Sequence, residues 1–133
     1  MLEIDLIQTR GFKNVSESGK TTGFELHIRT PYYRGMWASL LEGADVTVDG
    51  ETISREKIQW TISGATYSLA ELAASKDVRW PFDEAAVLTA PKPGGLAVGV
   101  HDVHVCLRFR ASYMPPDMGP WITNAERKLA ITR

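Results

Sequence analysis

The chain of 133 residues has the length of one domain, which can bury roughly two thirds of its unfolded surface without disulfides or metals. Its 15 Lys and Arg residues balance 16 Asp and Glu residues, and this near-neutral charge argues against nucleic acid as a partner. A single cysteine (Cys106), no signal peptide and no apolar run of roughly 20 residues predict a cytoplasmic protein that does not span a membrane.

The first half of the chain predicts short strands joined by turns. Apolar residues alternate with acidic ones over residues 2–6, which predicts a first strand, and residues 11–15 predict a second. Alternation is clearest over residues 23–29, where one face is apolar and the other polar. A further strand is expected to include residues 38–41. Asp49-Gly50 then predicts a hairpin, because a type I′ turn requires positive φ at both central residues.

The second half continues the β pattern. Strands are predicted over residues 58–62 and 85–90, and Trp60 is expected in the core. The longest alternation in the chain covers residues 103–113, so we expect this strand near the centre of a sheet. A last strand is expected around residues 129–131.

One helix is predicted, near residues 69–75. Ser68 and Glu71 fit a capping box, in which a hydroxyl caps the helix and a glutamate three residues later reaches back. Closely spaced strands, turns rich in Gly and Pro, and one short helix together predict an all-β fold. We therefore expect a single-domain antiparallel β-sandwich over residues 1–133.

The most unusual stretch follows the strand that Thr30-Pro31 ends. Residues 32–37 place aromatic side chains where small polar turn residues are the norm. One interpretation is that these rings fold back over the core. For the cluster as a whole we favour a binding or interface role, because aromatic residues and Arg anchor interfaces. Trp80 and Trp121 also lie at element ends and are expected to join this patch, whose target is a sugar ring or a partner protein.

Residue patterns for metal binding or catalysis are weak. His101-x-x-His104 resembles half a zinc site, but residues three apart in a strand face opposite sides, so hydrogen-bonded histidines are the better interpretation. Cys106 has no partner motif, and a lone strand thiol is usually packed. The adjacent carboxylates of Asp83-Glu84 diverge in extended chain and do not form an acid–base pair. The residues alone do not indicate an enzyme.

A family resemblance rests on short segments that occur in order along a chain of similar length. They are Gly-Phe-Lys-Asn-Val (11–15), Arg-Thr-Pro-Tyr-Tyr-Arg-Gly (29–35), Val-Thr-Val-Asp-Gly-Glu (46–51), Thr-Tyr-Ser-Leu-Ala-Glu-Leu (66–72), Arg-Trp (79–80), Lys-Pro-Gly-Gly-Leu (92–96) and Ser-Tyr-Met-Pro (112–115). Together they resemble the small β subunit of bacterial C-glycoside deglycosidases. Residues 116–125 match nothing in that family pattern.

The resemblance implies a division of labour. A small β-sandwich subunit pairs with a larger α subunit, a TIM barrel of the sugar isomerase/epimerase type. The α subunit carries a divalent metal of the Mn or Mg type and the catalytic residues, so no cofactor and no catalytic residue are expected in this chain. The substrate is a 3-oxo-C-glycoside. Its ketone acidifies the proton at C2, and the carbon–carbon bond to the aromatic aglycone breaks by elimination.

The resemblance also implies that the loops of the β subunit lie on the partner or at the mouth of its active site. The residues assigned to this role are Tyr32, Tyr33, Arg34, Gly35, Trp37, Arg79, Trp80, Lys92, Gly94, Gly95, Tyr113 and Met114. Pairing with a local carboxylate is an alternative for Arg34. For the three glycines, backbone conformation is the preferred explanation.

Two other functions stay open from the sequence. The first is a stand-alone carbohydrate-binding sandwich, which would be monomeric and would bind glycosides without another chain. The second is an independent small hydrolase, which needs a nucleophile or metal constellation that the sequence does not show.

Overall fold

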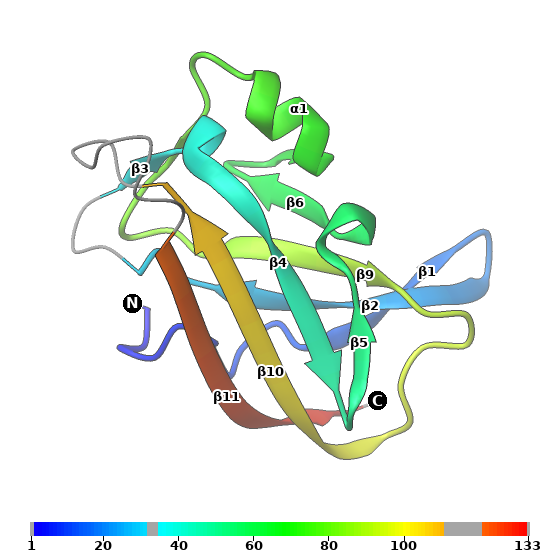
Figure 1. Ribbon diagram of the computed structural model, residues 1–133. Coiled ribbons are helices and arrows are strands. Elements are labelled where there is room, and N and C mark those ends of the chain that lie inside the picture. The colour runs from blue at the N-terminus through cyan, green and yellow to red at the C-terminus, as the bar shows by residue number, and fades with distance from the viewer. Residues whose placement is uncertain (1, 32–34, 111–120, 133) are drawn as a thin grey trace.

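The computed structural model describes residues 2–31, 35–110 and 121–132, and its chain forms two packed antiparallel sheets (Figure 1). Two 3-10 turns cover Ala38–Leu40 and Arg55–Lys57, and one α-helix, α1, covers Leu69–Ala74. The strands are β1 (Lys13–Glu17), β2 (Lys20–Ile28), β3 (Met36–Trp37), β4 (Leu41–Val48), β5 (Glu51–Ile53), β6 (Gln59–Ile62), β7 (Ala65–Tyr67), β8 (Arg79–Trp80), β9 (Ala86–Pro91), β10 (Gly99–Phe109) and β11 (Trp121–Ile131).

The two sheets have different strand orders. The first has the order β1-β2-β9-β6-β7, so β9 crosses over to lie between β2 and β6. The second has the order β11-β10-β4-β5, and β10 lies between β11 and β4 as its long alternation predicts. A short ribbon of β3 and β8 stands beside them at one end (Figure 1). The prediction of an antiparallel β-sandwich with one short helix is confirmed.

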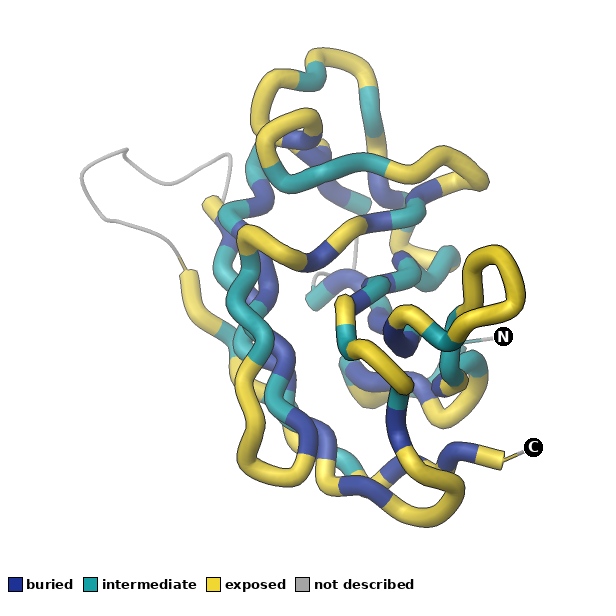
Figure 2. The backbone as a smooth tube through the Cα atoms, turned by 90° about the vertical axis from the view of Figure 1, so that its right-hand side faces the viewer, coloured by how far each residue is buried: buried dark blue, intermediate teal, exposed yellow. Residues whose placement is uncertain are grey.

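The core fills the space between the two sheets. Buried and exposed positions alternate along the strands, because successive side chains of a strand point to opposite faces (Figure 2). Phe24, Leu26 and Ile28 of β2 are fully buried, as predicted. Trp60 is also fully buried and meets the ring of Trp80 edge to face, with the ring centroids 5.7 Å apart. Two buried indoles in contact make this the bulkiest part of the core.

Two local predictions are confirmed in detail. Asp49 and Gly50 have φ values of 50° and 87°, and they join β4 to β5 in the expected tight hairpin. At α1, the Ser68 hydroxyl accepts a hydrogen bond from the backbone N–H of Glu71, and the Glu71 carboxylate accepts one from the N–H of Ser68. Local chemistry therefore fixes both features.

The N-terminal segment corrects the predicted first strand. Residues 2–6 form no strand, and residues 4–6 form bends, because the Gln8 side chain accepts from the N–H of Glu3 and donates to the carbonyl of Asp5, which folds the segment on itself. Only Ile7 makes a β-bridge, to Ile28. The alternation was real, but side-chain hydrogen bonds replaced a strand ladder.

Three boundaries also differ from prediction. The second strand begins at Lys13, after Gly11 with φ +85°. Residues 38–40 form a 3-10 turn instead of a strand, and β4 begins at Leu41. The last strand, β11, begins at Trp121, well before Leu129. None of the helices in the described ranges has the length and apolarity needed to cross a membrane.

Candidate functional site

The β3–β8 ribbon organises one end of the sandwich. Met36 pairs with Trp80, and Trp37 pairs with Arg79. Gly35 lies against the β8 backbone, where an added Cβ would come 2.7 Å from the Trp80 carbonyl oxygen. The close approach of the β8 backbone therefore explains why this position is a glycine, whereas the sequence predicts that an unusual backbone conformation is the reason.

Trp37 and Arg79 form an exposed pair on the ribbon. The guanidinium carbon of Arg79 lies 5.5 Å from the centroid of the Trp37 ring, within the range of a cation–π interaction. Trp37 is 45% exposed, and Arg79 is also exposed. The ribbon thus presents an aromatic ring that its own arginine holds in place.

Trp80 corrects the prediction that its ring faces outward at the surface. Its side chain is fully buried, and its indole N–H donates to the carbonyl of Glu84 at 2.9 Å. The alternation of the short strand β8 explains the difference, since Arg79 points out and Trp80 points in. Trp80 therefore packs in the core beneath the ribbon and is not part of the exposed surface.

Further apolar side chains are exposed at the same end. Backbone hydrogen bonds join this end together, from Ala38 to Val78 and from Arg110 to Leu40, and Phe109 pairs with Trp121. The exposed residues here are Trp37, Phe82, Trp121 and Ile122, with exposures of 45%, 53%, 45% and 52%. We call these four residues and Arg79 the aromatic end.

Sequence reasoning found only part of the aromatic end. It named Trp37 and Arg79 and expected Trp121 in the same patch, but it missed Phe82 and Ile122. The alternation of β11 against β10 could have placed Trp121 beside Phe109. The predicted residues Tyr32, Tyr33, Arg34, Tyr113 and Met114 lie outside the described residues.

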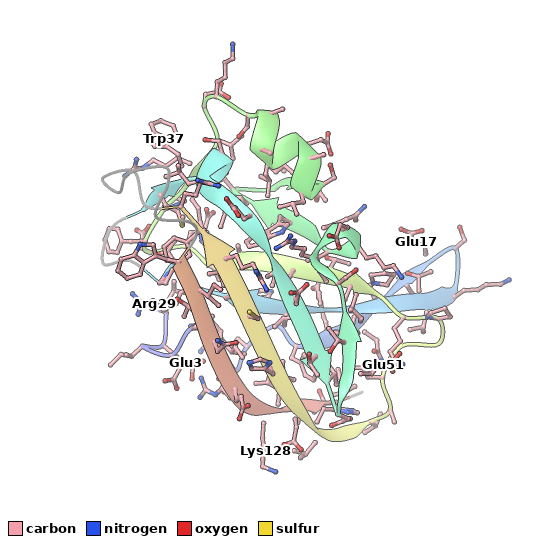
Figure 3. All side chains as sticks on the ribbon, in the orientation of Figure 1. Glu3, Glu17, Arg29, Trp37, Glu51 and Lys128 are labelled. Atoms are coloured by element: carbon pink, nitrogen blue, oxygen red, sulfur yellow. The ribbon has the colours of Figure 1, made fainter. Side chains whose placement is uncertain are left out.

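The turn over residues 92–95 lies at the opposite end, which corrects its predicted place beside Arg79 and Trp80. Strand β9 separates the two regions, since Ala86 pairs with Ile28 and Pro91 pairs with Gly23. Figure 3 shows the separation through Trp37 and Glu51, the latter being the residue that Lys92 contacts at 2.8 Å. The two groups therefore do not form one continuous patch on this chain.

Local hydrogen bonds account for this turn. The N–H of Lys92 donates to Thr22 and that of Gly94 to Thr21, which holds the turn against β2. Asn14 both donates to the carbonyl of Leu96 and accepts from its N–H, each at 2.8 Å. Gly95 has φ +68°, and an added Cβ would lie 2.6 Å from the Asn14 Oδ1 atom. Folding requirements explain these residues without any ligand.

The two histidines of β10 face opposite sides, as predicted. His101 is buried and contacts Asp49 through Nδ1 at 2.6 Å and the Ala97 carbonyl through Nε2 at 2.7 Å. These acceptors, first Ala97 and then Asp49, raise the pKa of His101. His104 contacts the Asn124 amide oxygen at 3.1 Å on the other face.

Two of the solvent-open hollows on the surface contain a histidine in their lining. One of about 450 Å³ is lined in part by Arg10, His27 and Asp83, and burial lowers the pKa of His27. The other, of about 510 Å³, is lined in part by His104 and Lys128 on the second sheet. Within the described ranges, no three His, Cys, Asp or Glu side chains gather as metal ligands would.

Comparison with known proteins identifies the family to which this sequence is similar. Residues 2–113 match the family model described as C-glycoside deglycosidase beta subunit. A protein of that name from Eubacterium cellulosolvens is 39% identical over 116 residues, which cover 86% of this chain and 79% of the relative. Another from Arthrobacter globiformis is 31% identical over 113 residues, which cover 82% of this chain and 86% of the relative.

A third relative has a more specific name. The 3′-dehydrocarminate deglycosidase beta subunit of a Microbacterium species is 30% identical over 96 residues, covering 71% of this chain and 70% of the relative. The family match covers most of the sequence, including both strands of the β3–β8 ribbon. This chain belongs to the family of C-glycoside deglycosidase beta subunits.

Proposed function

We propose that this chain is the accessory subunit of a heteromeric C-glycoside deglycosidase that acts on 3-oxo-C-glycosides. Its partner would be an α subunit of the sugar isomerase/epimerase type, a TIM barrel that holds the catalytic residues. The name of the family, a beta subunit, supports a heteromeric enzyme. The role assigned to this chain is to stabilise the complex and to cover the mouth of the active site.

The proposed reaction is an elimination. A base on the α subunit takes the C2 proton, which the neighbouring ketone makes acidic. The electron pair of the C2–H bond forms a C1=C2 double bond conjugated with the ketone, while the C1–aryl bond breaks and the aryl carbon receives a proton. A divalent cation of the Mn²⁺ or Mg²⁺ type, held by the α subunit, would stabilise charge on the ketone oxygen. This chain would contribute by excluding water from that site.

The observation that carries the proposal is the aromatic end. Trp37, Phe82 and Trp121 are large apolar side chains, each about half exposed, and they gather at one end of a domain whose core is otherwise well buried. Trp, other aromatic residues and Arg are enriched where interfaces derive most of their binding free energy. The mouth of a TIM barrel, formed by its βα loops, is a surface that such an end could cover.

The Trp37–Arg79 pair is suited to this role because it is ordered in advance. The ribbon fixes both backbones, and the cation–π contact holds the indole in one orientation. Less side-chain entropy is then lost on association than for a mobile ring. We place the complex in the cytoplasm, where a lone thiol such as the half-buried Cys106 stays reduced.

The experiment is reconstitution with the candidate α subunit. Each chain is purified alone and both are produced together, and release of the aglycone from a 3-oxo-C-glycoside is followed by chromatography. We expect a stable complex that is active only when both chains are present. If this chain alone binds simple glycosides and ignores the barrel, the proposal is wrong and the carbohydrate-binding alternative replaces it.

Variants show whether the aromatic end makes the contact. Trp37→Ala and Phe82→Ala should weaken complex formation by at least about tenfold, as loss of an interface anchor does. Val100→Ala is the matched control, because Val100 is 69% exposed but lies at the opposite end. Equal losses for the control and the two test variants would contradict the assignment of this end.

A further inference from the structure

Arg108 is the one cationic side chain in the described residues that has a solvent-shielded N–H without a hydrogen-bond acceptor. It lies on the outer face of the second sheet, where Gly43 and Ile122 are its neighbours on the adjacent strands. Its Nε atom is shielded from solvent and donates to no acceptor. No ion pair of the guanidinium with a described carboxylate is present either.

The charged groups nearby are satisfied. Arg110 pairs with Glu42. Asp45 accepts a hydrogen bond from the backbone N–H of Arg55 at 2.8 Å, and Lys128 reaches Asp102 at 3.1 Å at the far end of the same face. Glu42, Asp45 and Asp102 therefore have other partners, and Glu126, which lies opposite His104 on this face, forms no ion pair with Arg108. Arg108 remains as a positive charge without a counter-charge in the described part of the chain.

An unpaired arginine is an unfavourable choice for a position of this kind. A shielded N–H that donates to nothing loses its hydrogen bonds to water without replacement, so it lowers the stability of the free chain. An apolar side chain of similar length would pack over Gly43 without that loss. Positions that oppose stability in this way are expected where a function requires the residue.

The neighbourhood of Arg108 indicates the kind of partner. Ile122 is half exposed on one side of it, and Trp121 of the aromatic end precedes Ile122 in the same strand. A carboxylate side chain on a partner protein, with apolar residues around it, would complement both the charge of Arg108 and the apolar side chains beside it. A free anion would satisfy only the charge.

We propose that Arg108 receives a carboxylate of the α subunit and extends the interface of the aromatic end onto the outer face of β10. This inference rests on the proposed function. The planar guanidinium would present Nε and one Nη to the two carboxylate oxygens after the side chain turns outward from the sheet. Side-chain rotations of this kind are common at interfaces. Pairing would remove the penalty that the free chain carries, which favours the complex.

The test compares stability and binding for the same variants. Arg108→Met keeps the length of the side chain and removes the charge, and Arg108→Lys keeps the charge but loses the fork. Thermal unfolding of the chain alone and the dissociation constant with the α subunit are measured for each. Lys128→Met is the matched control, because it removes a cation from the same face at a residue that has a partner.

The expected results have opposite signs. Arg108→Met should unfold at the same or a higher temperature than the wild type, yet bind the α subunit at least about tenfold more weakly. Arg108→Lys should show an intermediate loss of affinity, and Lys128→Met should bind like the wild type.

Two results would overturn the inference while leaving the proposed function intact. One is wild-type affinity for Arg108→Met, and the other is a lower unfolding temperature for that variant, which would make Arg108 a structural residue. Failure of the wild-type chain to bind the α subunit would instead contradict the proposed function and the inference together.

Discussion

The two ends of this sandwich differ in how their polar side chains are paired and in the size of the apolar side chains that they expose. At the end that contains Asp49, Lys92, Gly95 and His101, which we call the hairpin end, side chains find partners within the chain, as Lys92 does with Glu51 and Asn14 with Leu96. At the aromatic end, large aromatic side chains stay half exposed, whereas the exposed apolar residues of the hairpin end are the smaller Val98 and Val100. The same strands run between both ends (Figure 1), so strand pairing alone does not produce the difference.

The difference separates residues that serve folding from residues available for binding. Turns of the hairpin end must adopt unusual backbone conformations, and their hydrogen bonds hold those conformations in place. The β3–β8 ribbon fixes the backbone of the aromatic end, but the indole and phenyl rings there remain exposed to solvent. Exposed aromatic groups on a rigid support are a feature of interfaces. The predictions below change one end at a time.

The largest expected effect is removal of the support beneath the aromatic end. Trp80→Ala should lower the free energy of unfolding by about 3–5 kcal/mol, because it leaves a cavity against Trp60 in the core. Urea unfolding of the variant measures this. Trp121→Ala is the control, since a ring that is 45% exposed should contribute about 1 kcal/mol or less. Similar losses for both variants would show that exposure does not distinguish the two rings.

The next effect concerns close approach at the hairpin end. Gly95→Ala should cost about 2–3 kcal/mol, because it combines positive φ with a contact of 2.6 Å to Asn14. Gly94→Ala is a matched control: its φ is also positive, at +80°, but an added Cβ meets nothing within 4 Å, so about 1 kcal/mol is expected. The difference between the two free energies of unfolding isolates the contact. Equal values would mean that backbone strain alone explains both glycines.

The stability of the fold should depend on pH through His101 at the hairpin end. Both ring nitrogens of His101 face acceptors, the Ala97 carbonyl and the Asp49 carboxylate, so only the doubly protonated imidazolium can donate to both. Its pKa in the folded chain is raised above the ordinary value of 6.5. The resulting stabilisation is complete below the unfolded pKa and is lost as the pH rises through the folded pKa.

Unfolding measured from pH 6 upward tests this sign. The wild type should lose stability over that range, and His101→Gln should show a smaller loss because it has no titrating ring at this position. His104→Gln is the control, since His104 lies on the outer face beside Asn124. A pH slope that His101→Gln leaves unchanged would assign the titration to another group.

Several features could be predicted from the sequence, at the hairpin end and elsewhere, because their determinants are local. Asp49-Gly50 specifies its turn through backbone conformation, and Ser68 with Glu71 specifies the helix start in the same way. The error over residues 2–6 has the same origin, since a single side chain, Gln8, competes with the ladder. Alternation shows which side chains share a face but not whether a neighbouring strand is present.

The aromatic end was only partly predictable, because tertiary pairing assembles it. The aromatic composition of the loops and the family resemblance predict an interface role for Trp37 and Arg79. Their contact, however, depends on a ribbon of two short strands far apart in the sequence. Trp80 was assigned outward because a two-residue strand gives too little alternation to fix its direction. The turn with Lys92 was placed at the wrong end because the length of β9 separates it from Arg79.

The smallest expected effect on stability comes from the Trp37–Arg79 pair itself. A double-mutant cycle of Trp37→Ala and Arg79→Ala should give a coupling of about 0.5–1 kcal/mol in unfolding, the range of an exposed cation–π contact. The same cycle measured on affinity for the α subunit should give a larger coupling, because desolvation at an interface strengthens cation–π attraction. A coupling of equal size in both measurements would mean that the pair remains in water when the complex forms. The aromatic end would then lie outside the contact, and its exposed rings would need another explanation.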